Sequence, residues 1–188
     1  MNRSLLLCLL SIVCCAGEAA AQPAVEIRSA FGASNYLHGD IPYIAPTVVV
    51  AARFGRGSLA VEPEFAVAWD QETQTFGINT STTSSDRFQS VGVNLIGRSP
   101  GRVSAYGGGG VGLYSEHWTY RVESPQFGGT QSGTRGPRLG AQAVAGVDFT
   151  LASHVKAFGQ FRYEIRSFED PGGGSVVQGF AGVAIVLR

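Results

Sequence analysis

Eight short stretches of the chain alternate apolar residues with small or polar ones, and this period-two pattern constrains the fold more than any other feature. Successive side chains of a β-strand point to opposite faces, so each stretch predicts a strand with one apolar face. No such stretch is long enough for a membrane-spanning helix, which needs about 20 apolar residues. The predicted strands lie at about 24–34, 43–54, 58–69, 86–97, 102–115, 138–150, 154–166 and 176–187.

The links between these strands alternate strictly between short and long. The short links are 53–57, 98–102 and 151–153, and the long links are 35–42, 70–85, 116–137 and 167–175. Short turns at one rim and long loops at the other are typical of an antiparallel barrel that crosses a membrane. The pattern therefore predicts an all-β, eight-stranded antiparallel up-and-down transmembrane β-barrel, with both chain ends at the short-turn rim.

The orientation of the two strand faces decides between a membrane barrel and a soluble one. In the segment 59–69, one face carries Leu, Val, Pro, Phe, Val and Trp, and the other carries Ala and the acids Glu62 and Glu64. A soluble barrel needs a charged exterior, but only 15% of this chain is charged, against roughly 25–35% for a soluble surface. We therefore expect the apolar face to contact lipid and the other face to line a narrow lumen. An interfacial aromatic girdle is expected at Trp69, Tyr114, Phe149 and Tyr163.

The first 21 residues have the features of a secretory signal peptide: Arg3, an apolar run over 5–16 and the small residues Ala19-Ala20-Ala21. We expect residues 22–188 to form one barrel domain. All 3 cysteines lie within the leader, so the mature chain has no thiol for a disulfide or a metal site. The 14 basic and 14 acidic residues balance, which removes the electrostatic argument for nucleic-acid binding.

Three segments resemble the small bacterial outer-membrane β-barrel superfamily, which includes the transmembrane domain of outer-membrane protein A and opacity-type barrels. They are VSAYGGGGVGLY at 103–114, LGAQAVAGVDFTL at 139–151, and VKAFGQFRYEIR at 155–166 leading to the last strand FAGVAIVL. The resemblance implies a monomer in the bacterial outer membrane, in contact with lipid and lipopolysaccharide and inserted by the barrel-assembly machinery. Family members usually end in an aromatic residue, whereas this chain ends Val186-Leu187-Arg188; this departure from the family pattern concerns the terminal assembly signal and not the barrel.

Charged residues fall on the predicted inner faces, where an unpaired charge would cost several kcal/mol. We expect Asp148 and Lys156 to oppose each other across the hairpin at 151–153, and Arg162 to reach an acid on another strand. The favoured interpretation is a polar plug that stabilises the barrel, and the alternative is an ion path or gate. The predicted lumen network is Glu62, Glu64, Asp148, Lys156, Arg162 and Glu164.

Two motifs suggest chemistry, but neither predicts a catalytic, metal or cofactor site. Gly107, Gly109 and Gly112 match G-x-G-x-x-G, yet a dinucleotide site needs a helix after the glycines. His117 and Thr119, with Glu123, partly resemble the Ser/His/acid set of outer-membrane lipopolysaccharide deacylases, although those enzymes have serine in the His-x-Ser element. His38 and His154 are isolated, and a lone histidine is not a metal site.

The long polar loops 70–85 and 116–137 are the best candidates for function, because binding residues concentrate on loops held by a rigid scaffold. The predicted recognition residues are Trp118, Tyr120, Arg121 and Phe127, from residue types enriched at binding hot spots. The sequence thus predicts a structural or adhesion-type role for an extracellular or host ligand. The alternatives are a narrow pore or carrier for small solutes and a soluble periplasmic barrel that binds a small apolar ligand.

Overall fold

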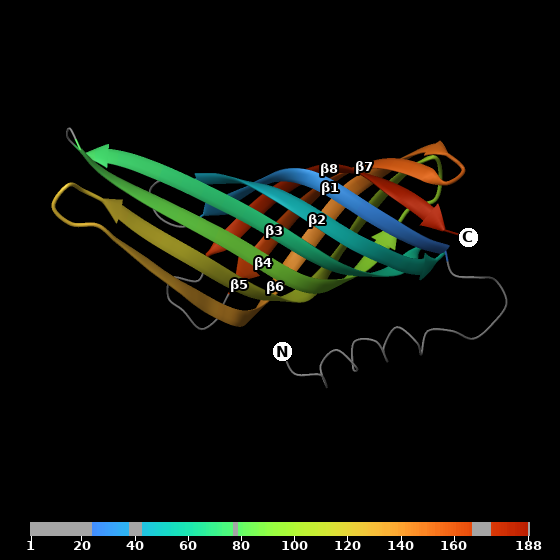
Figure 1. The fold of residues 1–188 in the computed structure, drawn as a ribbon. Coiled ribbons are helices and arrows are strands. Elements are labelled where there is room, and N and C mark those ends of the chain that lie inside the picture. The colour runs from blue at the N-terminus through green and yellow to red at the C-terminus, as the bar shows by residue number, and fades with distance from the viewer. Residues whose placement is uncertain (1–23, 38–42, 77–78, 167–173, 188) are drawn as a thin grey trace.

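The eight strands close into one ring, shown by the computed structural model in Figure 1. The structure describes residues 24–37, 43–76, 79–166 and 174–187. Each strand pairs antiparallel with its sequence neighbours, and β1 pairs with β8 to complete the ring, which confirms the predicted fold class. The strands are β1 (Ala24–Leu37), β2 (Tyr43–Arg56), β3 (Leu59–Phe76), β4 (Thr80–Arg98), β5 (Val103–Glu123), β6 (Gly129–Ala152), β7 (Val155–Arg166) and β8 (Ser175–Leu187).

Some of the sequence predictions cannot be compared with the fold. The predicted signal peptide and His38 lie outside the described residues. Within the described part of the chain, no helix is long and apolar enough to cross a membrane.

Large apolar side chains cover the outside of the ring. Leu59, Phe161 and Val183 are 60%, 52% and 53% exposed, so they do not converge on a common core. The outward apolar face of β3 runs from Leu59 to Trp69, close to the roughly 9–11 residues with which a tilted strand crosses a bilayer. This outer surface, called the apolar belt below, has the chemistry of a lipid contact.

The inside of the ring is polar, the reverse of a water-soluble protein. Buried charged side chains from several strands lie there together with small residues that leave them room. Tyr106 of β5 lies over Gly146 of β6, where a Cβ atom would meet the Tyr106 ring. The glycine-rich sequence of β5 and β6 thus lets a large ring lie flat inside a narrow barrel.

Three of the four residues expected in the aromatic girdle face outward, and the fourth, Tyr114, does not. Trp69, Phe149 and Tyr163 point outward and are partly exposed. Tyr114 is buried in the lumen, where its hydroxyl donates a hydrogen bond to Gln142 Oε1 over 3.1 Å. The even-numbered residues of β5 face inward, so Tyr114 lies on the same face as Tyr106.

The short links were predicted correctly, but two of the long links are mostly strand. Gly57, with a φ of 64°, lies in the turn after β2, and Gly101, with a φ of 122°, lies in the turn after β4. The predicted loops 70–85 and 116–137 instead form paired strands that prolong the β3–β4 and β5–β6 hairpins. Figure 1 shows both hairpins reaching past the other strands at the end opposite the C-terminus.

We call this four-stranded projection the extension, comprising residues 69–76, 80–89, 115–123 and 129–138. Its sides have no partner strand among the described residues, because the pairing of β3 with β2 stops at Ala68 and that of β6 with β7 begins at Gly140. The sequence did not indicate these strands, since beyond Trp69 both faces are polar and the hydrophobic alternation ends. Backbone hydrogen bonds between antiparallel strands do not require hydrophobic alternation, so the pairing continues beyond Trp69.

If the apolar belt contacts lipid, a new charge should destabilise the barrel within the belt but not on the outer face beyond it. Replacing Phe161 with Lys should lower the free energy of unfolding by about 2–4 kcal/mol, because a lysine near the bilayer midplane loses hydration. Urea unfolding in lipid vesicles measures this cost. The control Gln71→Lys places the same charge on the outer face beyond the belt and should have little effect. Equal stabilities for both variants would contradict a lipid-facing belt.

Candidate functional site

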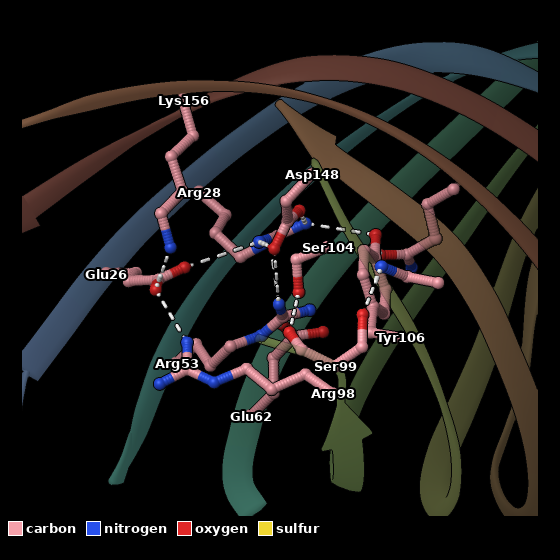
Figure 2. A network of polar contacts seen from close by, with 12 residues as sticks. Glu26, Arg28, Arg53, Glu62, Arg98, Ser99, Ser104, Tyr106, Asp148 and Lys156 are labelled. Atoms are coloured by element: carbon pink, nitrogen blue, oxygen red, sulfur yellow. Dashed lines mark hydrogen bonds and ion pairs between the residues drawn. The ribbon is translucent and has the colours of Figure 1, made fainter. Parts of the chain in front are cut away.

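The lumen holds a first layer of ion pairs near the short-turn rim (Figure 2). Lys156 Nζ lies 2.6 Å from Glu26 Oε1, and Arg98 Nη1 lies 2.9 Å from the same oxygen. Because β1, β4 and β7 supply these three residues, the contacts cross the barrel interior. We call this group the turn-side layer; its charged members are Glu26, Arg28, Arg53, Glu62, Arg98, Asp148 and Lys156.

Two arginines at the centre of the turn-side layer share one carboxylate and one ring. Arg28 Nη2 and Arg53 Nη1 lie 3.0 and 3.1 Å from the two oxygens of Asp148. Their guanidinium carbons lie 5.1 and 4.3 Å from the centre of the Tyr106 ring. Arg53 Nε also donates to Glu62 Oε2 over 2.6 Å. Charge-assisted bonds and cation–π contacts together compensate the removal of these cations from water.

A second layer lies further toward the long hairpins, and we call it the hairpin-side layer. Arg162 forms ion pairs with Glu64 of β3 and Glu164 of β7. Glu64 Oε1 also accepts a 2.7 Å hydrogen bond from Gln142 Nε2. Arg166 Nη2 lies 2.7 Å from Glu164 Oε2. Acids and bases balance in this layer, and the amide of Gln142 adds hydrogen bonds to Glu64 and Asn94.

The two layers leave little free space between them. A cavity of about 10 Å³ lies among residues that include Arg28, Glu62 and Glu64, close to the least volume that holds one water molecule. The charged groups on its wall belong to the ion pairs already described. The lumen is therefore a packed polar core with the composition expected of a plug.

All six residues of the predicted lumen network point inward, but they divide between the two layers. Arg162 reaches an acid on another strand, as expected. The predicted opposition of Asp148 and Lys156 is wrong. Asp148 lies opposite Phe158, and Lys156 lies opposite Thr150 next to a register shift. Lys156 instead contacts Glu26, and Asp148 binds the two arginines of β1 and β2.

The sequence interpretation missed four of the seven charged residues in the turn-side layer, namely Glu26, Arg28, Arg53 and Arg98. Glu26 and Arg28 alternate with Val25 and Ile27, so counting the period along the first strand could have found them. Arg53 gave no such signal, because small and apolar residues occupy both faces of β2 before it. Only the closed ring shows that Arg53 faces Glu62 and Asp148.

The two catalytic-looking motifs lie in extended strands. Gly107, Gly109 and Gly112 are within β5, which continues to Glu123, so the helix of a dinucleotide site is missing. His117 and Glu123 are six residues apart on one strand, about 20 Å at the usual rise per residue. His117 Nδ1 lies 3.0 Å from Thr134 Oγ1. Among the described residues, no group of His, Cys, Asp and Glu has the geometry of a metal site.

The four predicted recognition residues lie on the extension or at its tip, and three of them are in strand β5 instead of a loop. Trp118 packs over Gly133, and Arg121 forms an exposed ion pair with Glu123 at 2.7 Å. Tyr120 is 43% exposed, and Phe127, in the link between β5 and β6, is 67% exposed. The structure therefore places three of these residues on a paired sheet and Phe127 in the link at its tip.

A group of acids occupies the base of the extension. Asp70 lies directly across from Asp86, and Glu116 follows on the neighbouring strand. Partial burial, followed by the charges of Glu116 and Asp70, raises the pKa of Asp86 above its ordinary value. Arg135 offsets part of this effect and lies 3.5 Å from Glu116. Negative charge is thus in local excess here.

The chain belongs to the outer membrane protein beta-barrel domain family, whose profile matches residues 6–185. It is an integral barrel of the bacterial outer membrane, and the alternative of a soluble periplasmic barrel is wrong. Among curated protein sequences, none matches this chain.

Solved structures share this fold at low sequence identity. Ail, the attachment invasion locus protein of Yersinia pestis, was solved with the heparin analogue sucrose octasulfate; it is 16% identical, with a TM-score of 0.62 over 89% of this chain and 100% of Ail. Neisserial surface protein A is 14% identical, with a TM-score of 0.62 over 89% of this chain and 99% of that protein. The Escherichia coli outer membrane protease OmpT is 7% identical, with a TM-score of 0.54 over 90% of this chain and 99% of OmpT.

The buried ion pairs predict that Arg162→Ala destabilises the barrel without opening it. The change leaves Glu64 and Glu164 without their shared cation and should cost about 3–5 kcal/mol in urea unfolding. The turn-side layer remains, so planar bilayers should show no large single-channel current. Arg121→Ala, which breaks an exposed ion pair, is the matched control and should change stability little. A large current from the Arg162 variant would contradict the plug.

The cluster of acids around Asp86 predicts that Asp86→Asn raises the free energy of unfolding in a pH-dependent way. Because folding raises the Asp86 pKa, the ionised carboxylate destabilises the folded state at neutral pH. The variant should be slightly more stable at pH 7, by less than about 1 kcal/mol at this partly exposed site. The gain should shrink as the pH falls through the raised pKa and vanish below the ordinary value of 3.8. Urea unfolding at several pH values tests this; a loss of stability at pH 7 would contradict it.

Proposed function

We propose that this protein is a surface-interaction protein of the outer membrane, with the barrel as its anchor and the extension as its binding element. The extension carries the proposal, since four strands continue well past the point where their partner strands end. A barrel that only spans a membrane needs no such projection. Exposed aromatic side chains on it, including Phe76, Tyr120 and Phe127, are of the kind that dominates protein interfaces.

The general orientation rule for outer-membrane barrels supports a location of the extension outside the cell. In outer-membrane barrels the short turns face the periplasm and the long hairpins face the medium. The outer face of the extension begins directly above the apolar belt, where Arg87 lies across from Trp69 and His117. Lipopolysaccharide headgroups would meet this face, and an extracellular or host ligand would meet the rest of the projection.

The structural neighbours support an adhesion-type role at the level of the fold. Ail is an attachment protein and was solved with a heparin analogue, and NspA is a surface protein. At 16% and 14% identity these likenesses concern the backbone, so the ligand of this chain has to be argued from its own surface.

Catalysis and transport have weaker support. The protease OmpT shares the fold, but here His117 lies far from Glu123 along one strand. If the barrel were a pore, a solute would have to pass two layers of paired charges that include Arg28, Arg162 and Glu164. We therefore propose a role without catalysis, and the current measured for Arg162→Ala separates the plug from the pore.

Shortening the extension tests its role. Residues 72–84 and 120–131 are each replaced by Asn-Gly, which joins the cross-strand pairs Gln71–Ser85 and Thr119–Ser132 through tight turns. Bacteria that display this variant should lose adherence to cultured epithelial cells and to extracellular-matrix protein. The barrel should keep its heat-modifiable mobility on gels, since the belt and both lumen layers are intact.

Variants with one shortened hairpin each serve as controls and show which hairpin carries binding. Undiminished adherence of the doubly shortened variant, at equal surface abundance, would overturn the proposed function.

A further inference from the structure

The inner face of the extension continues the face that lines the lumen. Side chains keep alternating between the two faces, and the β3–β4 and β4–β5 pairing has no register shift, from the buried residues Ala68 on β3, Ser90 on β4 and Tyr114 on β5 outward. Beyond the lumen, the described residues place no strand opposite this face. On β3, β4 and β5 its larger side chains include Asp70, Glu72, Asp86, Phe88, Glu116, Trp118 and Tyr120.

The inner face of the extension is acidic on balance. Its strands β3, β4 and β5 carry Asp70, Glu72, Asp86 and Glu116, while β6 adds Arg135 beside Glu116 and Arg138 opposite Tyr114. The outer face of the same three strands carries Arg87 and Arg121, with Glu123 paired to Arg121. A cationic ligand is therefore attracted to the inner face, whereas a sulfated glycan is repelled from it.

Aromatic rings lie beside the acids on the inner face. Trp118 lies directly across from Asp86, and Tyr120 lies across from Ser84 one step further out. Gly133 lies under the Trp118 ring, and because glycine has no side chain, the indole can lie against the sheet. Rings next to carboxylates suit guanidinium and ammonium groups, which gain both cation–π and ionic contacts.

The chain already binds one of its own guanidinium groups in this way. At the foot of the inner face, the Arg166 guanidinium carbon lies 5.0, 5.4 and 5.3 Å from the ring centres of Tyr36, Phe88 and Tyr114. Glu164 supplies the carboxylate. The same combination continues outward with Trp118, Tyr120, Asp86 and Glu116, where no arginine of β7 follows among the described residues.

The open side of β3 adds a backbone contact for an extended ligand. Its residues 69–76 contain no proline and no register shift in their pairing with β4. On the other side of the extension, a register shift and Gly136-Pro137 interrupt β6, as in edge strands that avoid pairing. An extended peptide could add to β3 and direct alternate side chains to the inner face.

We propose that the inner face of the extension and the open edge of β3 bind an extended cationic polypeptide, with its arginine or lysine side chains between Trp118, Tyr120 and the acids Asp86 and Glu116. This inference rests on the proposed surface function and specifies the partner by its charge. It differs from the anionic heparin analogue held by Ail.

Tryptophan fluorescence of the detergent-solubilised protein, purified free of lipopolysaccharide, tests this inference. Trp69→Phe leaves Trp118 as the single tryptophan of the 2 in the chain. The peptide (Arg-Thr)5 should shift the Trp118 emission saturably, and less so in 1 M salt, whereas (Glu-Thr)5 and sucrose octasulfate should not. In peptide anisotropy, Asp86→Asn with Glu116→Gln should weaken binding about tenfold or more, and Trp118→Leu about threefold.

The matched control is Glu123→Gln, which removes one acid from the outer face of the same strand and should leave the Kd unchanged. Equal binding of both peptides, an equal loss with Glu123→Gln, or Trp118 quenching by sucrose octasulfate would overturn the inference. So would self-association through this face, seen as a dimer that (Arg-Thr)5 does not dissociate. If the peptide fails but the shortened extension still abolishes adherence, the surface function stands and only the cationic partner is rejected.

Discussion

Hydrocarbon offers backbone amides no water to bond with, and every other feature of this structure depends on that constraint. Strands can cross a membrane only when their ring closes, since an open edge would leave a row of donors and acceptors unpaired. Here the closing pair is β1 with β8, from Val25 against Leu187 to Leu37 against Ser175. Closure with eight strands makes the interior so narrow that side chains fill it. The polar lumen is the consequence, because the lipid-facing positions take the apolar residues.

A narrow closed lumen then dictates how its charges are arranged. A buried cation is tolerated only beside anions and hydrogen-bond partners, so the lumen charges occur as layers in which each carboxylate contacts at least two bases, or a base and an amide. Glu26 binds Lys156 and Arg98, and Glu64 binds Arg162 and Gln142. Beyond the ring, the constraint ends. Strands in the extension expose both faces to water, and charges there do not need the buried partners that the lumen charges have.

The sequence predicted the structure where lipid contact and burial impose a two-residue hydrophobic alternation, and it did not where this alternation is absent. Alternation on β3 and β7 predicted that Glu62, Glu64, Arg162 and Glu164 face inward, and their placement follows from the backbone alone. It could not predict that Lys156 binds Glu26, because that contact joins β1 to β7 across the closed barrel. The extension was mistaken for loops for a related reason: without a hydrophobic face, a polar strand and a polar loop have similar sequences.

The ion pair between Glu26 and Lys156 also has a consequence for how the barrel reaches its final form. Its two residues are separated by 130 positions and meet only when the first and last strands have found each other. A half-formed sheet would carry both charges into hydrocarbon without their partners, at a cost that grows with every strand inserted singly. Insertion strand by strand is therefore penalised, and joining the ends of the sheet becomes the step that makes membrane entry favourable.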